Sequence, residues 1–235
     1  MASRREQKEA LRREREERER RAREAEQRKR LVGYGVGAAL VLAALAVVSI
    51  LLLGGGGGGQ ARAAVLPDGG QVPAQRLTSL SKAASAAGCR LTSQRASSRE
   101  HTRSPDERVR YATDPPSSGR HYLEPAPDGA YPTAPSDERV VHSLEHGRVV
   151  VWFKPSLPAA TRANLKALFD EHSFLELLVP RARMPYAVAA SAWTRDPEPL
   201  GTGHLLTCPR FHRATFDALR AFSAEYRGKG PETVP

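Results

Sequence analysis

Residues 136–153 read S-D-E-R-V-V-H-S-L-E-H-G-R-V-V-V-W-F and predict a short helix followed at once by a buried strand. Ser136 can accept a backbone N–H as an N-cap, and the acidic residues after it suit the positive first turn of a helix. Gly147 stands where helices commonly end in a left-handed residue. The run 149–153 is wholly β-branched or aromatic, which is typical of a strand buried on both faces. We therefore expect this strand at the centre of the sheet.

The chain after this point predicts an α+β domain with a central mixed sheet. From residue 148 onward the expected order is β-α-β-β-β-α, which is the connectivity of a thioredoxin-like domain. Residues 154–157 read K-P-S-L, so the C-x-x-C of a disulfide oxidoreductase is missing after the first strand. The remaining expected elements are helices over 73–87, 158–172 and 211–227, strands over 89–93, 108–112, 174–179, 185–193 and 204–207, and an ordered Pro-rich loop over 113–135.

His142 and His146 are four residues apart on the predicted helix and, with Glu145, spell H-x-x-E-H. This spacing places both imidazoles on one face, where they can bind one metal ion. His121 of the Pro-rich loop is the expected third ligand, because the prolines and the glycine before it stiffen and then turn the chain. Three imidazoles with a water suit zinc, whereas a Met or Cys ligand would indicate copper. The reserve ligands are His101, Glu145, Met184 and His204.

Two other interpretations of these histidines stay open. Imidazoles in the last turn can satisfy free carbonyl groups and the negative end of the helix dipole without any metal. The H-x-x-E-H pattern also resembles the inverzincin metallopeptidase signature, in which Glu145 would act as general base for metal-bound water. That enzyme needs a further acidic ligand, which the sequence does not identify.

The residues before the expected globular domain at 73–232 predict a membrane anchor. Residues 1–30 hold thirteen Lys or Arg and eight Glu and predict a charged helix. Residues 31–53 carry no charge and can cross a hydrocarbon layer about 30 Å thick, so they predict one transmembrane helix. Residues 54–72 predict a Gly-rich tether. A signal peptide cleaved near 61–63 is the alternative, but its apolar region would normally be only about 7 to 15 residues long.

The charge distribution predicts the orientation of this anchor and its lipid partner. Basic residues directly precede the apolar run, and six glycines follow it. The positive-inside rule therefore places the N-terminus in the cytoplasm and the globular domain outside the plasma membrane. Half of the net charge of +10 lies in residues 1–30, where anionic lipid headgroups are the expected partner. The outer part mixes both signs without a stripe of Arg and aromatic residues, which argues against nucleic-acid binding.

Cys89 and Cys208 both fall on the outer side of the predicted membrane span. A lone pair of cysteines in an oxidising compartment predicts a disulfide. The alternative is a reactive thiol, because Cys208 would begin the last helix, and a helix N-terminus favours the thiolate.

Five ordered blocks resemble one bacterial family. They are A-A-G-C (86–89), D-P-P-S-S-G-R-H-Y (114–122), V-H-S-L-E-H-G-R-V-V-V (141–151), M-P-Y-A-V-A-A-S-A-W (184–193) and G-H-L-L-T-C-P (203–209), and Y-R-G-K-G-P-E (226–232) extends them. The chain is similar in these blocks to domain-of-unknown-function family 3105. The resemblance implies a membrane-anchored or exported protein and assigns no activity. Residues 194–202 depart from the family pattern as an expected loop insertion.

These observations support three functional hypotheses. The first is a membrane-anchored, extracytoplasmic domain that binds zinc or copper through His121, His142 and His146. The second is a structural or assembly protein of the cell envelope that uses no metal. The third is a metal-assisted hydrolase. The sequence identifies no protein partner.

Overall fold

The computed structural model describes residues 64–232. The predicted charged tail (1–30), the membrane span (31–53) and most of the tether (54–72) lie outside these residues. Within 64–232, no helix is long and apolar enough to cross a membrane.

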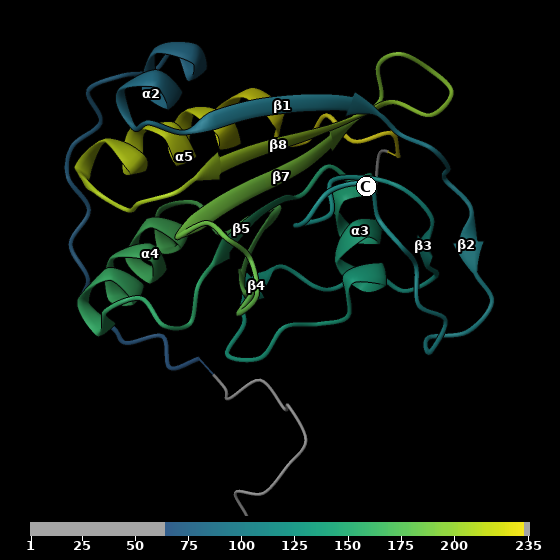
Figure 1. The fold of residues 1–235 in the computed structure, drawn as a ribbon, viewed down its shortest axis with the longest axis horizontal. Coiled ribbons are helices and arrows are strands. Elements are labelled where there is room, and N and C mark those ends of the chain that lie inside the picture. Colours follow the sequence, from purple (N-terminus) through teal and green to yellow (C-terminus); the bar gives the residue numbers. More distant parts are fainter. Residues whose placement is uncertain (1–63, 233–235) are drawn as a thin grey trace, which may run out of the picture. The chain divides into compact units, whose positions relative to one another are not determined.

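A six-stranded mixed sheet forms the centre of the domain (Figure 1). Its strands lie in the order β1-β8-β7-β5-β6-β4. β5 runs parallel to β6 and antiparallel to β7, while β8 is antiparallel to both β7 and β1. The predicted mixed sheet is therefore confirmed, with β5 between two neighbours. The strand bounds are β1 (Arg90–Arg95), β4 (Gly129–Ala130), β5 (Val149–Phe153), β6 (Glu176–Pro180), β7 (Val188–Thr194) and β8 (Thr202–Cys208).

Helices cover both faces of the sheet, and all five residues of β5 are buried as predicted. Val149, Val151 and Phe153 point into a core shared with α2, α4 and α5. Val150 and Trp152 point into a second core shared with α3. Figure 1 shows α2, α4 and α5 at one side of the domain and α3 at the other, beside β2 and β3. The helix bounds are α2 (Leu80–Ala86), α3 (Asp137–Glu145), α4 (Ala159–Glu171) and α5 (Arg213–Tyr226).

The C-terminal half follows the predicted order, because β5, α4, β6, β7, β8 and α5 succeed one another along the chain. The predicted helix over 73–87 was too long, since α2 begins only at Leu80. The backbone N–H groups of Arg76 and Leu77 instead donate to the carboxylate of Asp217 on α5. Tertiary hydrogen bonds thus replace the first turns of the expected helix.

The strand predicted over 108–112 was wrong. The N–H of Val109 donates to the side chain of Glu138 at 3.0 Å rather than to a neighbouring strand. The nearby strand pair is instead parallel and two residues long, formed by β2 (His101–Thr102) and β3 (His121–Tyr122).

Cys89 and Cys208 form a disulfide with their Cα atoms 4.3 Å apart. Sheet register explains this proximity, because Arg90 pairs with Thr207 in the ladder between β1 and β8. Cys208 ends β8, and α5 begins at Arg213. The interpretation of Cys208 as a thiol at a helix N-terminus was therefore wrong.

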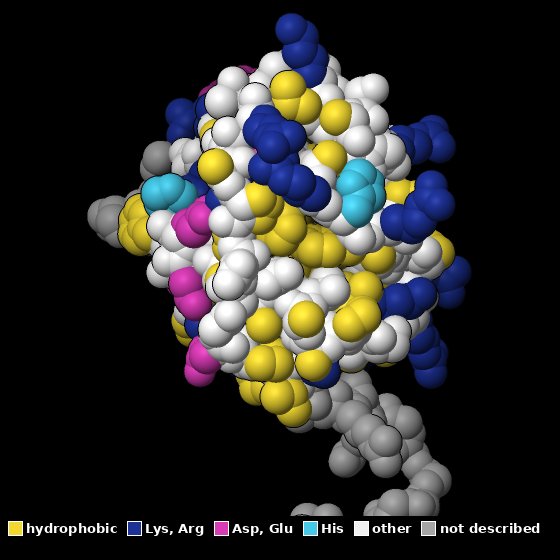
Figure 2. Space-filling view, turned by 90° about the vertical axis from the view of Figure 1, so that its left-hand side faces the viewer, with side chains coloured by type: hydrophobic (Ala, Val, Ile, Leu, Met, Phe, Trp, Pro, Cys, Tyr) yellow, Lys and Arg dark blue, Asp and Glu magenta, His cyan; other side chains and the backbone are white. Residues whose placement is uncertain are grey.

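The surface of the described domain carries both signs of charge. Figure 2 views the side where α2, α4 and α5 lie and shows hydrophobic side chains in its middle. Basic side chains gather toward one margin and acidic side chains toward the other. The net charge of +10 therefore does not make this side uniformly basic.

Candidate metal centre

Helix α3 begins and ends where its sequence predicted. The Ser136 side chain accepts the N–H of Arg139 at 3.4 Å, and Gly147 has a φ of 77° directly after the C-cap residue His146. The helix presents His142 and Glu145 to the interior, where they are 4 % and 2 % exposed. Both side chains can act as metal ligands, and their burial fixes them in place.

The Pro-rich loop lies directly on α3. Ser143 Oγ donates to the carbonyl of Ala126 at 2.7 Å, and the Ala126 N–H donates to the carbonyl of Arg139 at 3.1 Å. Pairing of β2 with β3 sets His101 opposite His121. The loop therefore brings His121 to the helix face that carries Glu145, and the strand pair adds His101.

Four side chains from three elements converge here: His101, His121, His142 and Glu145, which we call the inner group. One ligand atom from each lies within 4.8 Å of all the others. The rings of His121 and His142 are 4.8 Å apart, and Trp193 of β7 packs edge-on against His121 at 5.9 Å. Only His101 is exposed, so the group is closed on its other sides by protein.

Backbone carbonyls determine which ring nitrogens carry protons. Nδ1 of His121 lies 2.7 Å from the carbonyl oxygen of Gly119, and Nδ1 of His142 lies 2.7 Å from that of Tyr122. A carbonyl only accepts, so each Nδ1 is the donor. Burial, reinforced by neighbouring His121, lowers the pKa of His142 to about 4, which leaves that ring neutral near pH 7. Nε2 of His142 therefore presents a lone pair.

Glu145 is held as a carboxylate beside His121. Burial alone would raise the pKa of Glu145, but His121 and Arg99 lower it to about 2. Arg99 Nε donates to Oε1 at 2.6 Å, and Oε2 lies 2.9 Å from Nε2 of His121. That second contact is within ion-pair distance, yet His121 Nε2 is buried and makes no well-aligned hydrogen bond to any described residue. Because Nδ1 is engaged by the Gly119 carbonyl, Nε2 is the ring atom that faces the carboxylate of Glu145.

A second set of ligands adjoins the first: His142, His146 and Glu232, which we call the outer group. Nε2 of His146 lies 3.0 Å from Nε2 of His142 and 3.2 Å from Oε2 of Glu232. Burial lowers the pKa of His146, although Glu232 opposes this shift. Because both neighbours of Nε2 are acceptors, the neutral ring carries its proton on Nε2 and shares it between them.

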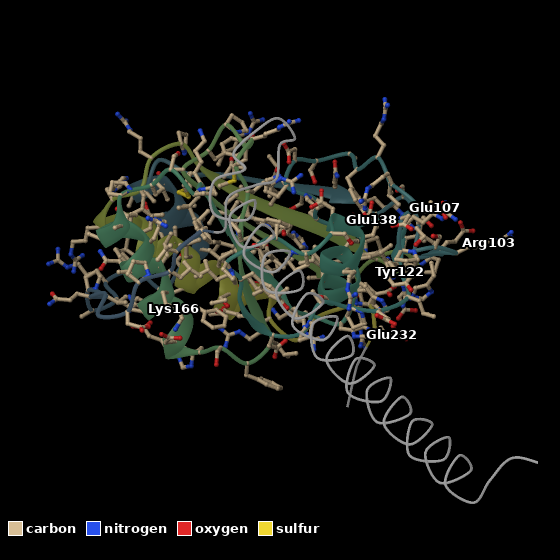
Figure 3. The ribbon with its side chains drawn as sticks, turned by 90° about the horizontal axis from the view of Figure 1, so that it is seen from below. Arg103, Glu107, Tyr122, Glu138, Lys166 and Glu232 are labelled. Carbon is tan, nitrogen blue, oxygen red and sulfur yellow. A yellow bond between two sulfur atoms is a disulfide. The ribbon has the colours of Figure 1, made fainter. Side chains whose placement is uncertain are left out.

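The C-terminal segment delivers Glu232 to the end of α3. The Gly228 N–H donates to the carbonyl of Gly147 at 2.8 Å, and the Glu232 N–H donates to the carbonyl of Glu145 at 3.0 Å. Figure 3 shows Glu232 and Tyr122 close to α3, away from Lys166 of α4. The segment thereby covers the free carbonyl end of the helix.

The three predicted ligands are divided between the two groups. His121 lies with His142, and His146 lies with His142, but His121 and His146 belong to different groups. Two reserve ligands, His101 and Glu145, complete the inner group. Glu232 and Arg99 were missed, because their sequence positions carry no spacing relation to α3. The block Y-R-G-K-G-P-E was the one signal pointing to Glu232.

The other two reserve ligands are engaged elsewhere. His204 lies between the hydroxyl groups of Ser93 and Thr194, with contacts of 2.8 and 2.9 Å. Its ring stacks on Tyr226 at 4.1 Å. Met184 is fully buried in the core next to α3.

Comparison with known proteins gives one match. A family model described as protein of unknown function (DUF3105) matches residues 102–234, which is more than half of the chain. No curated protein and no solved structure matches the chain. The matched range includes His142, Glu145, His146 and Glu232, and it begins one residue after His101.

Proposed function

We propose that this chain, which belongs to the DUF3105 family as its sequence blocks predicted, binds one zinc ion with the inner group. The observation that carries the proposal is the buried Nε2 of His121, which lacks a well-aligned hydrogen bond and faces Oε2 of Glu145 at 2.9 Å. Native proteins rarely bury a polar atom without a partner, and an ion is one of the few explanations. A divalent cation bound by both atoms would give Nε2 of His121 the partner that it lacks.

The spacing of the ligand atoms supports this assignment. Ligands bound to zinc at about 2.0 to 2.1 Å in a tetrahedron lie about 3.3 Å from one another. The pair formed by His121 and Glu145 is already close to this separation, at 2.9 Å. The largest separation within the group, at most 4.8 Å, would shorten by about 1.5 Å, which side-chain rotation can supply.

The surroundings of the ligands also suit a metal. Protein histidines that bind metals almost always donate their second ring nitrogen to a carbonyl or carboxylate, and ligating carboxylates are themselves hydrogen-bonded. His121, His142 and Glu145 each have such a partner, in Gly119, Tyr122 and Arg99 respectively. Three imidazoles and one carboxylate contain no sulfur, so the donor set favours zinc over monovalent copper.

The hydrolase hypothesis is less favoured by the same geometry. A general base works best with a pKa near the operating pH. The pKa of Glu145 is lowered to about 2, and one of its oxygens is bound by Arg99. We therefore assign Glu145 as a ligand. The structural hypothesis would instead treat His121 as doubly protonated and paired with Glu145.

We further propose that residues 31–53 anchor the domain outside the plasma membrane, with the N-terminus in the cytoplasm beside anionic lipid headgroups. The disulfide supports an oxidising compartment, where such bonds persist. A reporter active only outside the membrane, fused after Pro235, is expected to work. Activity of a cytoplasmic reporter at that position would show the opposite orientation.

The C-terminal half is proposed to be thioredoxin-like without the C-x-x-C. Its strand order β8-β7-β5-β6, with β7 antiparallel to both neighbours, supports this relationship. The β5–α4–β6 unit supplies the parallel crossover that the connectivity requires. The cysteines join β8 to the residue before β1, so we assign no thiol chemistry to this domain.

Metal content tests the proposed function. The full chain, purified with detergent and without added chelator, is expected to bind close to one zinc ion by mass spectrometry and calorimetry. His142→Asn keeps a donor for the Tyr122 carbonyl but removes Nε2, so it should lower the affinity at least tenfold. His172→Asn, at an exposed histidine beyond α4, is the matched control. A wild-type chain that takes up no zinc would favour the structural hypothesis.

A further inference from the structure

The outer group is a feature that the inner zinc site does not require. We propose that His142, His146 and Glu232 form an entry position, which receives the metal ion from solvent and passes it to the inner group through His142. This inference rests on the proposed metal-binding function and assigns a role to the C-terminal segment.

The outer group is already spaced for a metal ion. Its contacts of 3.0 Å between His146 and His142, and of 3.2 Å between His146 and Glu232, are close to the roughly 3.3 Å between ligands of a tetrahedral zinc ion. An ion that replaces the proton on Nε2 of His146 therefore needs little rearrangement.

Exposure gives the two groups different access to solvent. The side chains of Glu232 and His146 are 50 % and 14 % exposed, whereas those of His121 and Glu145 are 0 % and 2 % exposed. An incoming cation meets the exposed carboxylate first, and Coulomb attraction to a negative group raises association rates. His142 belongs to both groups, so it connects the exposed ligands with the buried ones.

A close backbone contact at Gly230 positions Glu232 at the C-terminal end of α3. A Cβ atom on Gly230 would clash with the nitrogen of Gly147 and the carbonyl oxygen of Glu145, so only glycine allows this close approach. The Glu232 N–H then bonds the carbonyl of Glu145, the residue whose side chain belongs to the inner group. This backbone hydrogen bond thus fixes the outer group next to the inner group.

The transfer consists of ligand exchange without oxidation or reduction. A hydrated divalent cation binds Glu232, His146 and His142, and the proton on Nε2 of His146 is transferred through water to Nδ1, so that the ring stays neutral. The bonds from the ion to His146 and Glu232 then break as bonds to His121 and Glu145 form. His142 Nε2 stays bound while its Nδ1–H keeps the ring tethered to the Tyr122 carbonyl.

Stopped-flow quenching of tryptophan fluorescence by Co²⁺ tests this route in the full chain. Trp193 contacts His121, so an ion in the inner group should quench it, and His121→Asn identifies which part of the signal is due to that position. Glu232→Gln should lower the rate constant for quenching about tenfold and leave the final affinity within about threefold of wild type. Glu225→Gln removes the same charge from an exposed site on α5 and should leave the rate unchanged.

A second pair of variants tests whether the outer position holds an ion by itself. His121→Asn should still bind Co²⁺ weakly, and adding Glu232→Gln should remove most of that binding. The entry route would be overturned if Glu232→Gln left the residual Co²⁺ binding of His121→Asn unchanged. Equal quenching rates in wild type, Glu232→Gln and Glu225→Gln would overturn it too, and neither result would affect the inner site. A wild-type chain that neither binds Co²⁺ nor is quenched would overturn the proposed function itself.

Discussion

Replacing His121 with Asn distinguishes a metal ligand from a structural ion pair. The imidazole of His121 is fully buried and donates from Nδ1 to the Gly119 carbonyl. An Asn side chain can keep a donor near that carbonyl but has no atom at the position of Nε2. The variant therefore removes the contact with Glu145 and leaves the loop attachment in place.

The two interpretations predict different dependence on zinc. A ligand that binds only the folded state at one hundred times its dissociation constant adds about 2.7 kcal/mol to the free energy of unfolding. If His121 is a ligand, the cost of His121→Asn should be larger in zinc than in EDTA by about 2 to 3 kcal/mol. This difference equals about 5 to 10 °C in melting temperature for a domain of this size. If His121 and Glu145 form a structural pair, breaking it should cost about 3 to 5 kcal/mol in both conditions.

The assay is chemical and thermal unfolding of the full chain, followed by circular dichroism, with and without zinc. Comparing the same variant in both conditions cancels the cavity left by the smaller side chain, since that cost does not depend on zinc. His172→Asn should show equal effects in zinc and EDTA. Equal costs of His121→Asn in the two conditions would refute its assignment as a ligand.

Three further predictions concern the fold around the site. A Cβ atom on Gly203 would lie 2.6 Å from a loop hydroxyl oxygen, so Gly203→Ala should cost about 1 to 3 kcal/mol in urea unfolding, whereas Gly129→Ala, with no neighbour closer than 3.7 Å, should change stability by less than about 0.5 kcal/mol. Replacing Cys89 and Cys208 with Ser opens a loop spanning a sequence separation of 119 and should lower the free energy of unfolding by up to about 5 kcal/mol, measured against the oxidised wild type. Burial lowers the pKa of His204 to about 4, so the unfolded state takes up this proton first as the pH falls. The free energy of unfolding should therefore keep the full contribution of neutral His204 above about pH 6.5 and lose about 1 to 2 kcal/mol of it toward pH 4, after allowance for solvent screening. The difference in free energy of unfolding between wild type and His204→Gln should shrink over the same pH range. The first prediction is contradicted if Gly203→Ala is as stable as Gly129→Ala in urea, and the second if loss of the disulfide leaves the unfolding midpoint unchanged. The third is contradicted if the stability difference between wild type and His204→Gln does not depend on pH.

Local sequence patterns were sufficient for the elements at the centre of the fold. Ser136, Gly147 and the apolar run 149–153 predicted α3 and β5, because caps, turns and burial patterns act over a few residues. Helical geometry alone also placed His142 beside His146, since residues four apart meet on one face. The same geometry moves His146 about 6 Å along the helix axis from His142. Helical geometry does not show, however, that His146 turns to Glu232 of the C-terminal segment and lies in a different group from His121.

Tertiary structure decided which side chains complete each group. His101 reaches His121 through a strand pair that the sequence did not predict, and Glu232 reaches His146 across 86 residues. Tertiary contacts also overrode local signals, as where Asp217 holds residues 76 and 77 outside α2. The orientation of each ring nitrogen depends on single carbonyl groups in the folded loop. Sequence periodicity could thus identify the histidines of α3, whereas loop packing, which depends on contacts between distant residues, determined what they can bind.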